Sequence, residues 1–256
     1  MDYLISSPEG KAFNLVLAIQ KPEVEVAEVT VIVDELARTL GLVSTMENAN
    51  AIWPSFFARP KRNSIQVFSD IQRFAVPAIK TACKNRHDSY IERLTAWRGV
   101  ESGTVVPQLQ NVLERLRTEI RNPAPKSSSY EISIYSPGLD AGYMSFPCLS
   151  HLSLKYDHRR GLIHLTALYR NHAYLSHAYG NFLGLGRLMQ FVCRETNTSL
   201  GELVSISTHA DAELTGRKSQ TSTALAKIRQ VLIERDSKTV TPGVHAVTAR
   251  GGTLVG

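Results

Sequence analysis

A cysteine, an arginine and an asparagine follow one another in an order that suits nucleophilic chemistry on a ring. Cys148 comes directly after Pro147 in FPCLSH, Arg170 ends the strand-like run LIHLTALYR, and Asn181 opens the helical run NFLGLGRLMQF. The thiolate is the nucleophilic form of cysteine, and a guanidinium close to a thiol lowers its pKa. Brought together, the three groups can attack a pyrimidine ring and hold it in register.

The other two cysteines carry no comparable pattern. Cys83 and Cys193 both lie inside helical patterns among apolar neighbours, where a cysteine acts as a small core residue. Three separated cysteines without a CxxC pair argue against disulfides and against a structural zinc site. The eight histidines form no HxxxH or HExxH spacing, so we expect no metal.

Composition indicates a globular protein with anionic partners. The chain has 256 residues and a formal net charge of +6, which suits nucleotides, folates or nucleic acid. Acidic and basic residues alternate in ERLRTE, as on a solvated helix face, so nucleic-acid binding is not expected to be the main function. No apolar run is long enough to span a bilayer and the first residues lack a signal pattern, so we expect a cytoplasmic protein without membrane contact.

The first half of the sequence predicts helices. Residues 11–43 carry the helical patterns LVLAIQ and VTVIVDELARTLG, although VTVIV also suits a strand, and residues 48–60 look irregular. Three further helical patterns follow, and residues 122–129 then interrupt the chain with prolines and serines. These patterns are IQVFSDIQRFAVPAIKTA, SYIERLTAW and VPQLQNVLERLRTEI.

The second half predicts a sheet. YEISIYSP, LSHLSLKYD and LIHLTALYR alternate as strands do, and the turn DHRRG joins the last two into a hairpin. A helix over 181–195, the strand VSISTHADAEL and a helix over 222–235 complete the pattern. We therefore expect one α+β domain over 1–256. It would have a mainly helical part (1–125), a sheet and catalytic part (126–235) and a loose tail (236–256).

Over about residues 127–214 the chain resembles the thymidylate synthase and nucleotide hydroxymethylase superfamily. The resemblance rests on SYEISIYSPGLDAGYMSFPC, LTALYRNHA, GNFLGLGRLMQF and SLGELVSISTHADAEL, in that order. It implies a mixed β-sheet covered by helices and a homodimer that packs sheet to sheet. It also implies a methyl or hydroxymethyl transferase that acts at C5 of a pyrimidine nucleotide or nucleoside, with 5,10-methylenetetrahydrofolate as the one-carbon donor.

The resemblance assigns roles to individual residues. Cys148 is the nucleophile that adds to C6 of the base, and Arg170 stabilises its thiolate and helps to bind phosphate. Asn181 hydrogen-bonds the N3 and O4 edge, where an amide suits a uracil-type base, but an asparagine before a helical run is also a common N-cap. Asn171 and Ser129 are further substrate-binding candidates.

Three more candidates come from the same alignment. His209 and Asp211 compete for the place of a histidine that binds sugar hydroxyls, because a two-residue shift decides between them; both also suit an exposed strand end. Glu92 resembles a catalytic glutamate on an early helix, and it also suits a solvated helix position beside Arg93.

The chain departs from the family pattern at several positions. Ser128 and Ser129 align with the paired arginines that clamp the partner's phosphate, and a serine cannot supply that charge, although Lys126 is close. Ala173 stands where an aspartate anchors the pterin ring, which puts folate use in doubt. Two other readings therefore stay open: a degenerate thymidylate-synthase-like binding or structural protein, and, ranked last, a cysteine hydrolase using His151 or His209.

Overall fold

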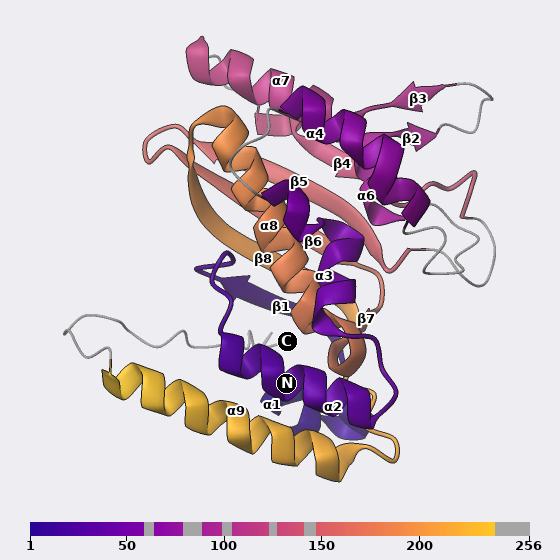
Figure 1. Cartoon of the computed structure of the whole chain (residues 1–256), viewed down its shortest axis with the longest axis vertical. Helices are drawn as coiled ribbons and strands as arrows, with labels where there is room; N and C mark the ends of the chain where they lie inside the picture. Colours follow the sequence, from indigo (N-terminus) through magenta and orange to yellow (C-terminus); the bar gives the residue numbers. More distant parts are fainter. Residues whose placement is uncertain (59–63, 79–88, 99–103, 123–126, 141–146, 239–256) are drawn as a thin grey trace, which may run out of the picture.

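The computed structural model describes the chain apart from residues 59–63, 79–88, 99–103, 123–126, 141–146 and 239–256. Its fold is α+β, as predicted, with a mixed six-stranded sheet flanked by helices (Figure 1). Cys83 and Lys126 lie outside the described residues. So does most of the tail predicted to be loose, although helix α9 (Lys218–Lys238) continues into that tail.

The sheet has the strand order β1-β8-β6-β5-β4, and the short strand β7 also pairs with β8. Strand β8 runs parallel to β6 and β7, whereas the remaining pairs in this sheet are antiparallel. The predicted hairpin is present as β5 and β6, with Gly161 at φ 67° in its turn. The bounds are β1 (Lys11–Ile19), β4 (Glu131–Ser133), β5 (Leu149–Asp157), β6 (Leu162–Tyr169), β7 (His172–Ala173) and β8 (Ser199–Asp211).

Two groups of helices pack around the sheet (Figure 1). The first group shares one apolar core with β4, β5, β6 and β8. It comprises α3 (Thr45–Ile52), α4 (Ser64–Asp70), α6 (Tyr90–Thr95), α7 (Gln108–Arg121) and α8 (Tyr179–Thr196). The second group comprises α1 (Asp2–Ser6), α2 (Ala27–Thr39) and α9.

Short elements connect the larger ones. Strands β2 (Trp97–Arg98) and β3 (Val105–Val106) form a separate two-stranded ribbon. Two π-helical turns, Ile71–Ala75 and Tyr174–Ala178, precede or extend α-helices. Three short 3₁₀ turns lie at Pro8–Gly10, Ser55–Ala58 and Ser127–Ser129.

Two sequence predictions in the N-terminal half were wrong. The run LVLAIQ was predicted to be helical, but it lies in β1, which pairs along its length with β8. Residues 48–60 were predicted to be irregular, but α3 extends from Thr45 to Ile52. Its start is fixed by a capping box in which the side chains of Ser44 and Glu47 each accept a hydrogen bond from the other residue's backbone N–H.

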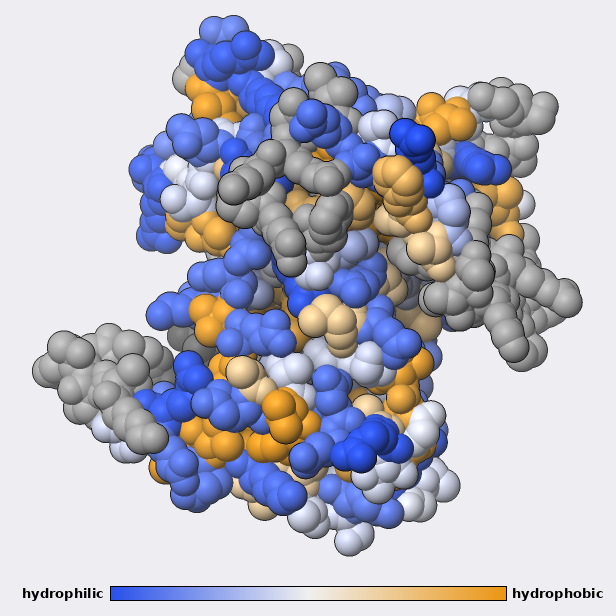
Figure 2. Space-filling view, viewed as in Figure 1, coloured by the Kyte–Doolittle hydropathy of each residue, from blue (hydrophilic) through white to orange (hydrophobic). Residues whose placement is uncertain are grey.

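The surface is largely hydrophilic on the face drawn in Figure 2, with a small apolar area over α2 and α9. Val31 on α2 and Ile233 on α9 belong to the exposed large apolar side chains of the molecule. Within the described part of the chain, no helix is both long and apolar enough to cross a membrane.

Glycines allow α8 to approach α3 closely. A Cβ atom added at Gly184 would lie 2.7 Å from Ala49 O and 2.9 Å from Ile52 Cβ. A Cβ at Gly180 would lie 2.5 Å from Asn48 Cβ. Because α8 carries Asn181, this close packing also determines where that amide lies.

We expect Gly184→Ala to lower the free energy of unfolding by about 1–3 kcal/mol, because the added methyl group forces α3 and α8 apart in a packed core. Urea denaturation followed by circular dichroism measures the change. An unchanged midpoint would show that the two helices separate without cost and would contradict the close packing described above.

Candidate active site

Cys148 and Arg170 meet where the hairpin strands β5 and β6 end. Leu149 pairs with Tyr169 in the sheet, and this register places the residue before β5 beside the residue after β6. The backbone N–H of Arg170 donates to Cys148 O at 2.9 Å, and its Nε donates to Pro147 O at 3.1 Å. The predicted pairing of a half-buried cysteine with an arginine is therefore present in the structure.

The charge of Arg170 does not by itself generate a thiolate. Burial raises the pKa of Cys148 above its ordinary value, and the nearby Arg170 guanidinium lowers the pKa by a smaller amount. Arg170 thus acts in the predicted direction, but desolvation outweighs it. The resting side chain is a neutral thiol at neutral pH.

We expect alkylation of Cys148 by iodoacetamide to be slow near neutral pH and to rise through a pKa above the ordinary cysteine value. Arg170→Met should move the profile to still higher pH, because the charge that lowers the pKa is lost. Mass analysis of the Cys148 peptide across about pH 6 to 11 gives the profile. A midpoint at or below the ordinary thiol pKa would contradict the balance of effects described here.

Two buried tyrosines lie close to Cys148, and the sequence analysis missed both. The backbone N–H of Leu149 donates to Tyr90 Oη at 3.5 Å, which ties α6 to the start of β5. Burial, and to a smaller extent the negative charge that a Cys148 thiolate would carry, raise the pKa of Tyr90 to about 12. Tyr169 is fully buried, and among the described residues its hydroxyl has no hydrogen-bond partner. Both phenols therefore stay protonated and available as donors.

Asn181 is not a helix N-cap. Helix α8 begins at Tyr179, with Ala178 as its N-cap, so Asn181 lies inside the first turn. Its side chain is buried, and its Nδ2 lies 3.3 Å from Nε2 of the buried His172. The ring of His172 stacks on Tyr169 with 3.9 Å between centroids. This chain of contacts connects Asn181 to the strand end that carries Arg170 and Cys148.

His209 and Asn171 form a second pair next to this site. His209 Nδ1 and Asn171 Oδ1 are 2.6 Å apart, and the His209 ring lies 5.5 Å from that of Phe13. Thr208, the residue before His209, donates from its hydroxyl to Arg170 O at 2.8 Å. The structure therefore brings these two predicted substrate-binding residues to the strand end that carries Arg170.

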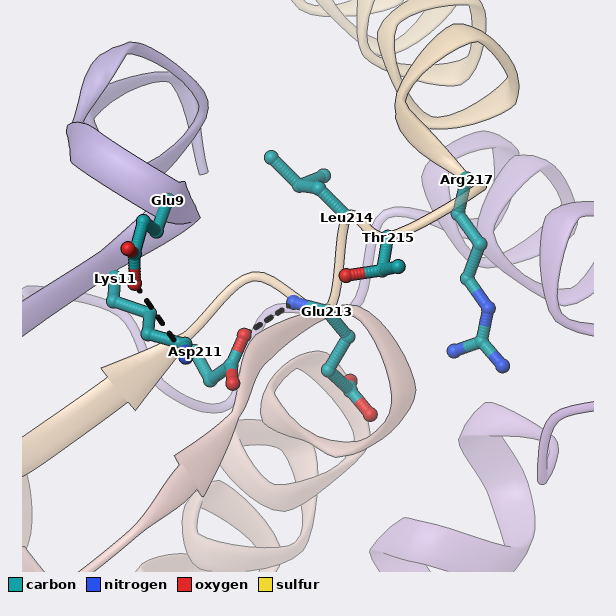
Figure 3. A pocket seen from close by; sticks show the side chains of 7 residues that line it. All are labelled: Glu9, Lys11, Asp211, Glu213, Leu214, Thr215 and Arg217. Carbon is teal, nitrogen blue, oxygen red and sulfur yellow. Dashed lines mark hydrogen bonds and ion pairs between the residues drawn. The ribbon is translucent and has the colours of Figure 1, made fainter.

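Asp211 lies further along β8, at a polar hollow of about 600 Å³ (Figure 3). The hollow lies between the start of β1 and the loop from β8 to α9. The sheet register places Asp211 beside Lys11 on β1 and beside Ala173 on β7. One oxygen of Asp211, Oδ1, accepts a hydrogen bond from Glu213 N at 2.7 Å. The lining residues are Glu9, Lys11, Asp211, Glu213, Leu214, Thr215 and Arg217.

Glu92 and Ser129 are not joined to Cys148 by the contacts described above. Glu92 is buried, not solvated, and its carboxylate lies 3.5 Å from the guanidinium of Arg98. Ser129 precedes β4, and the next residue, Tyr130, pairs through its carbonyl with Leu154 N. At roughly 3.3 Å per residue, that point of β5 lies about 20 Å from Cys148. Within one chain, Ser129 is therefore distant from the cysteine.

The structure gives little support for a cysteine hydrolase that pairs Cys148 with His151, or for a metal site. His151 Nε2 lies 2.8 Å from a carboxylate oxygen of Glu131, so this histidine is engaged away from Cys148. Within the described ranges, no group of three or more histidine, cysteine, aspartate or glutamate side chains is arranged to hold a metal ion.

Comparisons with known proteins agree with the motif reading. A "Putative thymidylate synthase" of Methanosarcina barkeri is 30% identical over 123 residues, which is 48% of this chain and 51% of that protein. A protein of the same name from Methanosarcina mazei is 28% identical over 123 residues, 47% of this chain and 51% of that protein. The chain thus spans about half the length of the curated relatives it matches.

The other comparisons are weaker. The solved structure of thermostable thymidylate synthase A from Bacillus subtilis aligns with 83% of this chain and 70% of its own, at 19% identity and a TM-score of 0.48. No protein-family model matches the chain. The sequence similarity to the archaeal proteins confirms the predicted resemblance: over about half of its length, this chain is similar to proteins named putative thymidylate synthase.

Proposed function

We propose that the protein transfers a one-carbon unit, as methyl or hydroxymethyl, to C5 of a uracil-type pyrimidine nucleotide or nucleoside. Cys148 would form a covalent adduct at C6 of the base. The main support is the continuous set of contacts from Cys148 and Arg170 through Tyr169 and His172 to Asn181. A solely structural role does not require a half-buried thiol, a guanidinium and a buried amide in one connected group.

The chemistry begins with the thiol. As Cys148 Sγ bonds to C6, its proton passes to water, and the C5=C6 electron pair moves onto C5 and O4 of the base. Asn181 would accept from N3–H and donate to O4, which stabilises the negative charge on that oxygen. C5 then forms its new bond to the one-carbon unit and releases its proton to water. Loss of Cys148 from C6 restores the double bond.

Two hydrogen-bonding groups would bind the rest of the nucleotide. Arg170 lies beside Cys148, where its guanidinium suits a phosphate, and His209 with Asn171 suits the hydroxyls of a sugar. Ser129 could reach a phosphate only from the second copy of a dimer, given its distance from Cys148 in its own chain. Glu92 remains a proposed organiser of protons near the base, from the same helix as Tyr90.

Methylenetetrahydrofolate is the proposed one-carbon donor, and the polar hollow fits its chemical character. Ala173 removes a carboxylate, but Asp211 stands beside Ala173 in the register of β7 and β8. The carboxylates of Asp211 and Glu213 suit the N–H groups of a pterin, and Lys11 and Arg217 suit an anionic tail. When bound, the folate would supply the electrophilic carbon at the methylene level and would leave as its free amine. A hydroxymethyl product would then take up water at that carbon, whereas a methyl product would require a hydride, for which the reduced pterin ring of the same folate is the proposed donor.

A second candidate is a thymidylate-synthase-like protein that binds nucleotides without a reaction. The raised pKa of Cys148 and the alanine at position 173 favour this alternative. The two candidates differ in one observable result. The transferase forms a covalent bond between Cys148 and the base, whereas the binding protein holds the ligand without a bond to sulfur.

Intact-protein mass spectrometry distinguishes the two candidates. The protein is incubated with 5-fluoro-dUMP, 5-fluoro-CMP and the matching nucleosides, with and without methylenetetrahydrofolate. The proposed function predicts a stable adduct with a uracil-type compound, and dependence on the folate would establish the donor. Absence of any adduct in the folded protein, together with tight noncovalent binding, would establish the binding protein instead.

The open face of the sheet supports the expected homodimer. Val16 and Ala18 on β1, Val204 and Ile206 on β8, and Leu168 on β6 are registered neighbours and share this face. Val16 is 57% exposed and the others are at least partly exposed in the single chain. A contiguous apolar sheet face is favourable only when another surface covers it. A second copy of the same chain provides such a surface.

We expect light scattering to give the mass of a dimer, and Val16→Lys to shift the protein to the monomer, because a buried unpaired charge opposes association. Ser222→Lys, at an exposed position of α9, adds the same charge outside this face and is the control. A monomeric mass for the unmodified protein would contradict the proposed dimer.

A further inference from the structure

A buried polar network surrounds His172 and includes the amide of Asn181. His172, Asn181 and Ser207 are all at most 5% exposed. Nδ2 of Asn181 lies 3.3 Å from His172 Nε2, and His172 Nδ1 lies 3.1 Å from Ser207 Oγ. Ser207 Oγ lies in turn 3.2 Å from Tyr174 Oη. Each polar atom of the imidazole therefore has one specific partner.

The arrangement of atoms determines where the imidazole proton lies. An amide NH₂ group only donates, so His172 Nε2 must carry no proton and accept from Asn181. The ring proton is then on Nδ1, which donates to Ser207 Oγ, and the Ser207 hydroxyl can give its own proton to Tyr174 Oη. Burial lowers the pKa of His172 to about 3, so the ring stays neutral at every physiological pH.

Aromatic neighbours hold the ring in this position. His172 stacks almost parallel on Tyr169, with an interplanar angle of 7°, and Phe182 meets it edge to face at 5.6 Å between centroids. The ring cannot rotate to exchange its nitrogens without displacing one of these buried side chains. A ring held in this way always presents the same nitrogen, Nε2, to Asn181 and the other, Nδ1, to Ser207.

We propose that His172, held in one tautomer by Ser207, is a positioning residue that fixes the amide orientation of Asn181 and so selects uracil-type over cytosine-type bases. This inference rests on the proposed function, in which Asn181 faces the base. With one N–H given to His172, Asn181 keeps an oxygen acceptor and a second N–H donor. Uracil offers N3–H and O4, which complement this pair.

Cytosine reverses the pattern at the same two positions. Its N3 accepts and its amino group donates, so a fixed amide would set N–H against N–H and oxygen against a ring nitrogen. A free amide could rotate by half a turn and accept cytosine. That rotation would place Oδ1 toward His172 and would require the proton on Nε2. The other tautomer would also require the hydroxyls of Ser207 and Tyr174 to reverse their hydrogen bonds, so the amide cannot rotate independently of this network.

The experiment compares Ser207→Ala with Ser205→Ala. Both serines are fully buried on β8, two residues apart and on the same side of the strand, but among the described residues the Ser205 hydroxyl makes no hydrogen bond. Calorimetry measures the affinities of both variants and the unmodified protein for uridine, cytidine, their deoxy forms and their monophosphates. We expect the preference for uracil to fall by about tenfold in Ser207→Ala and to stay unchanged in Ser205→Ala.

Nitrogen-15 NMR of the histidine ring provides a readout that a general loss of packing would not reproduce. The unmodified protein should show a protonated Nδ1 and a bare Nε2 for His172, and Ser207→Ala should show a mixture of tautomers. A protonated Nε2 in the unmodified protein would overturn the inference. So would an unchanged base preference in Ser207→Ala, or equal losses in the two serine variants.

The outcomes separate this inference from the proposed function. If the protein prefers uracil compounds, loses that preference in Ser207→Ala and yet forms no adduct with fluorinated bases, the transferase is wrong and the selection by His172 stands. If an adduct forms but Ser207→Ala leaves the base preference intact, the transferase stands and the role of His172 is wrong. Failure of the folded protein to bind any pyrimidine would overturn both.

Discussion

Cys148→Ser is expected to abolish the covalent adduct with a fluorinated uracil compound and to reduce turnover by at least about 10³-fold. Serine is close in size to cysteine, so the strand end should keep its shape. Its hydroxyl is a far weaker nucleophile than a thiol, and neither Tyr90 nor Tyr169 is a base, because burial keeps both phenols protonated. Intact mass and turnover are measured on the same preparations.

Cys193→Ser is the matched control, because it makes the same chemical change at a cysteine remote from solvent. Cys193 is buried in α8, and burial raises its pKa to about 11. This variant should lose some stability, since a hydroxyl replaces a thiol in the core, but it should still form the adduct. An adduct that survives in Cys148→Ser, or one that is lost equally in both variants, would exclude Cys148 as the nucleophile.

A binding experiment distinguishes loss of chemistry from loss of the site. Cys148→Ser should still bind the uracil nucleotide, because Arg170, Asn181 and the His209–Asn171 pair are untouched. The affinity should stay within a few fold of the unmodified protein's noncovalent affinity. A variant that neither binds nor reacts would indicate that the substitution has disturbed the strand end, and Cys148→Ala would then be the better test.

The C-terminal half could be predicted because its patterns are local. Strands β5 and β6 alternate apolar and polar side chains, and a five-residue turn joins them, so the hairpin follows from sequence. Register then places the residue before β5 beside the residue after β6, which explains why Cys148 and Arg170 were found together. Helix α8 was predicted for a similar reason, since its apolar residues recur with helical spacing.

Strand β1 could not be predicted in the same way. Its partner, β8, lies far along the chain, and no local pattern reports such a pairing. Val16 and Ala18 are apolar although they face the open side of the sheet, so the alternation that marks a strand is lost. The start of α3 could have been predicted from Ser44 and Glu47, which have the spacing of a capping box. Pro54 restricts the residues before it and led to the prediction of an irregular segment.

The missed site residues share one physical origin. The contacts of Tyr90, Tyr169, His172 and Ser207, on which their proposed roles rest, form only when α6, β6, β7 and β8 are packed against one another. No motif in the sequence marks His172, which follows Arg170 by two residues. Its contact with Asn181 depends on where α8 begins. Spacing along the chain was therefore enough to propose the groups that would react, but the side chains proposed to orient them required the tertiary structure.

Arg93→Met is expected to lower the free energy of unfolding by about 3–5 kcal/mol, because it leaves the Asp140 carboxylate buried without its cation. Both Arg93 and Asp140 are almost fully buried, and two hydrogen bonds of 2.5 and 2.8 Å join the guanidinium to the carboxylate. Arg93 also donates to Ile134 O at 2.7 Å. Denaturant unfolding measures the loss.

The same pair affects the candidate site through the two segments it connects. Arg93 lies on α6, which carries Tyr90, and Asp140 Oδ2 accepts from Ser136 N at 2.8 Å in the segment after β4. Breaking the pair should therefore slow adduct formation at Cys148 as well as destabilise the fold. The double variant Arg93→Met/Asp140→Leu should recover much of the stability, because an apolar pair leaves no buried charge.

Arg229→Met is the control for removing an arginine from an ion pair. Arg229 lies 2.6 Å from Asp2, but both side chains are more than half exposed, so water and salt replace the lost interaction. This variant should unfold close to the unmodified midpoint. If Arg93→Met were equally mild, the buried carboxylate would have to find a new partner or take up a proton. The pair would then not be what holds α6 against the segment that leads toward Cys148.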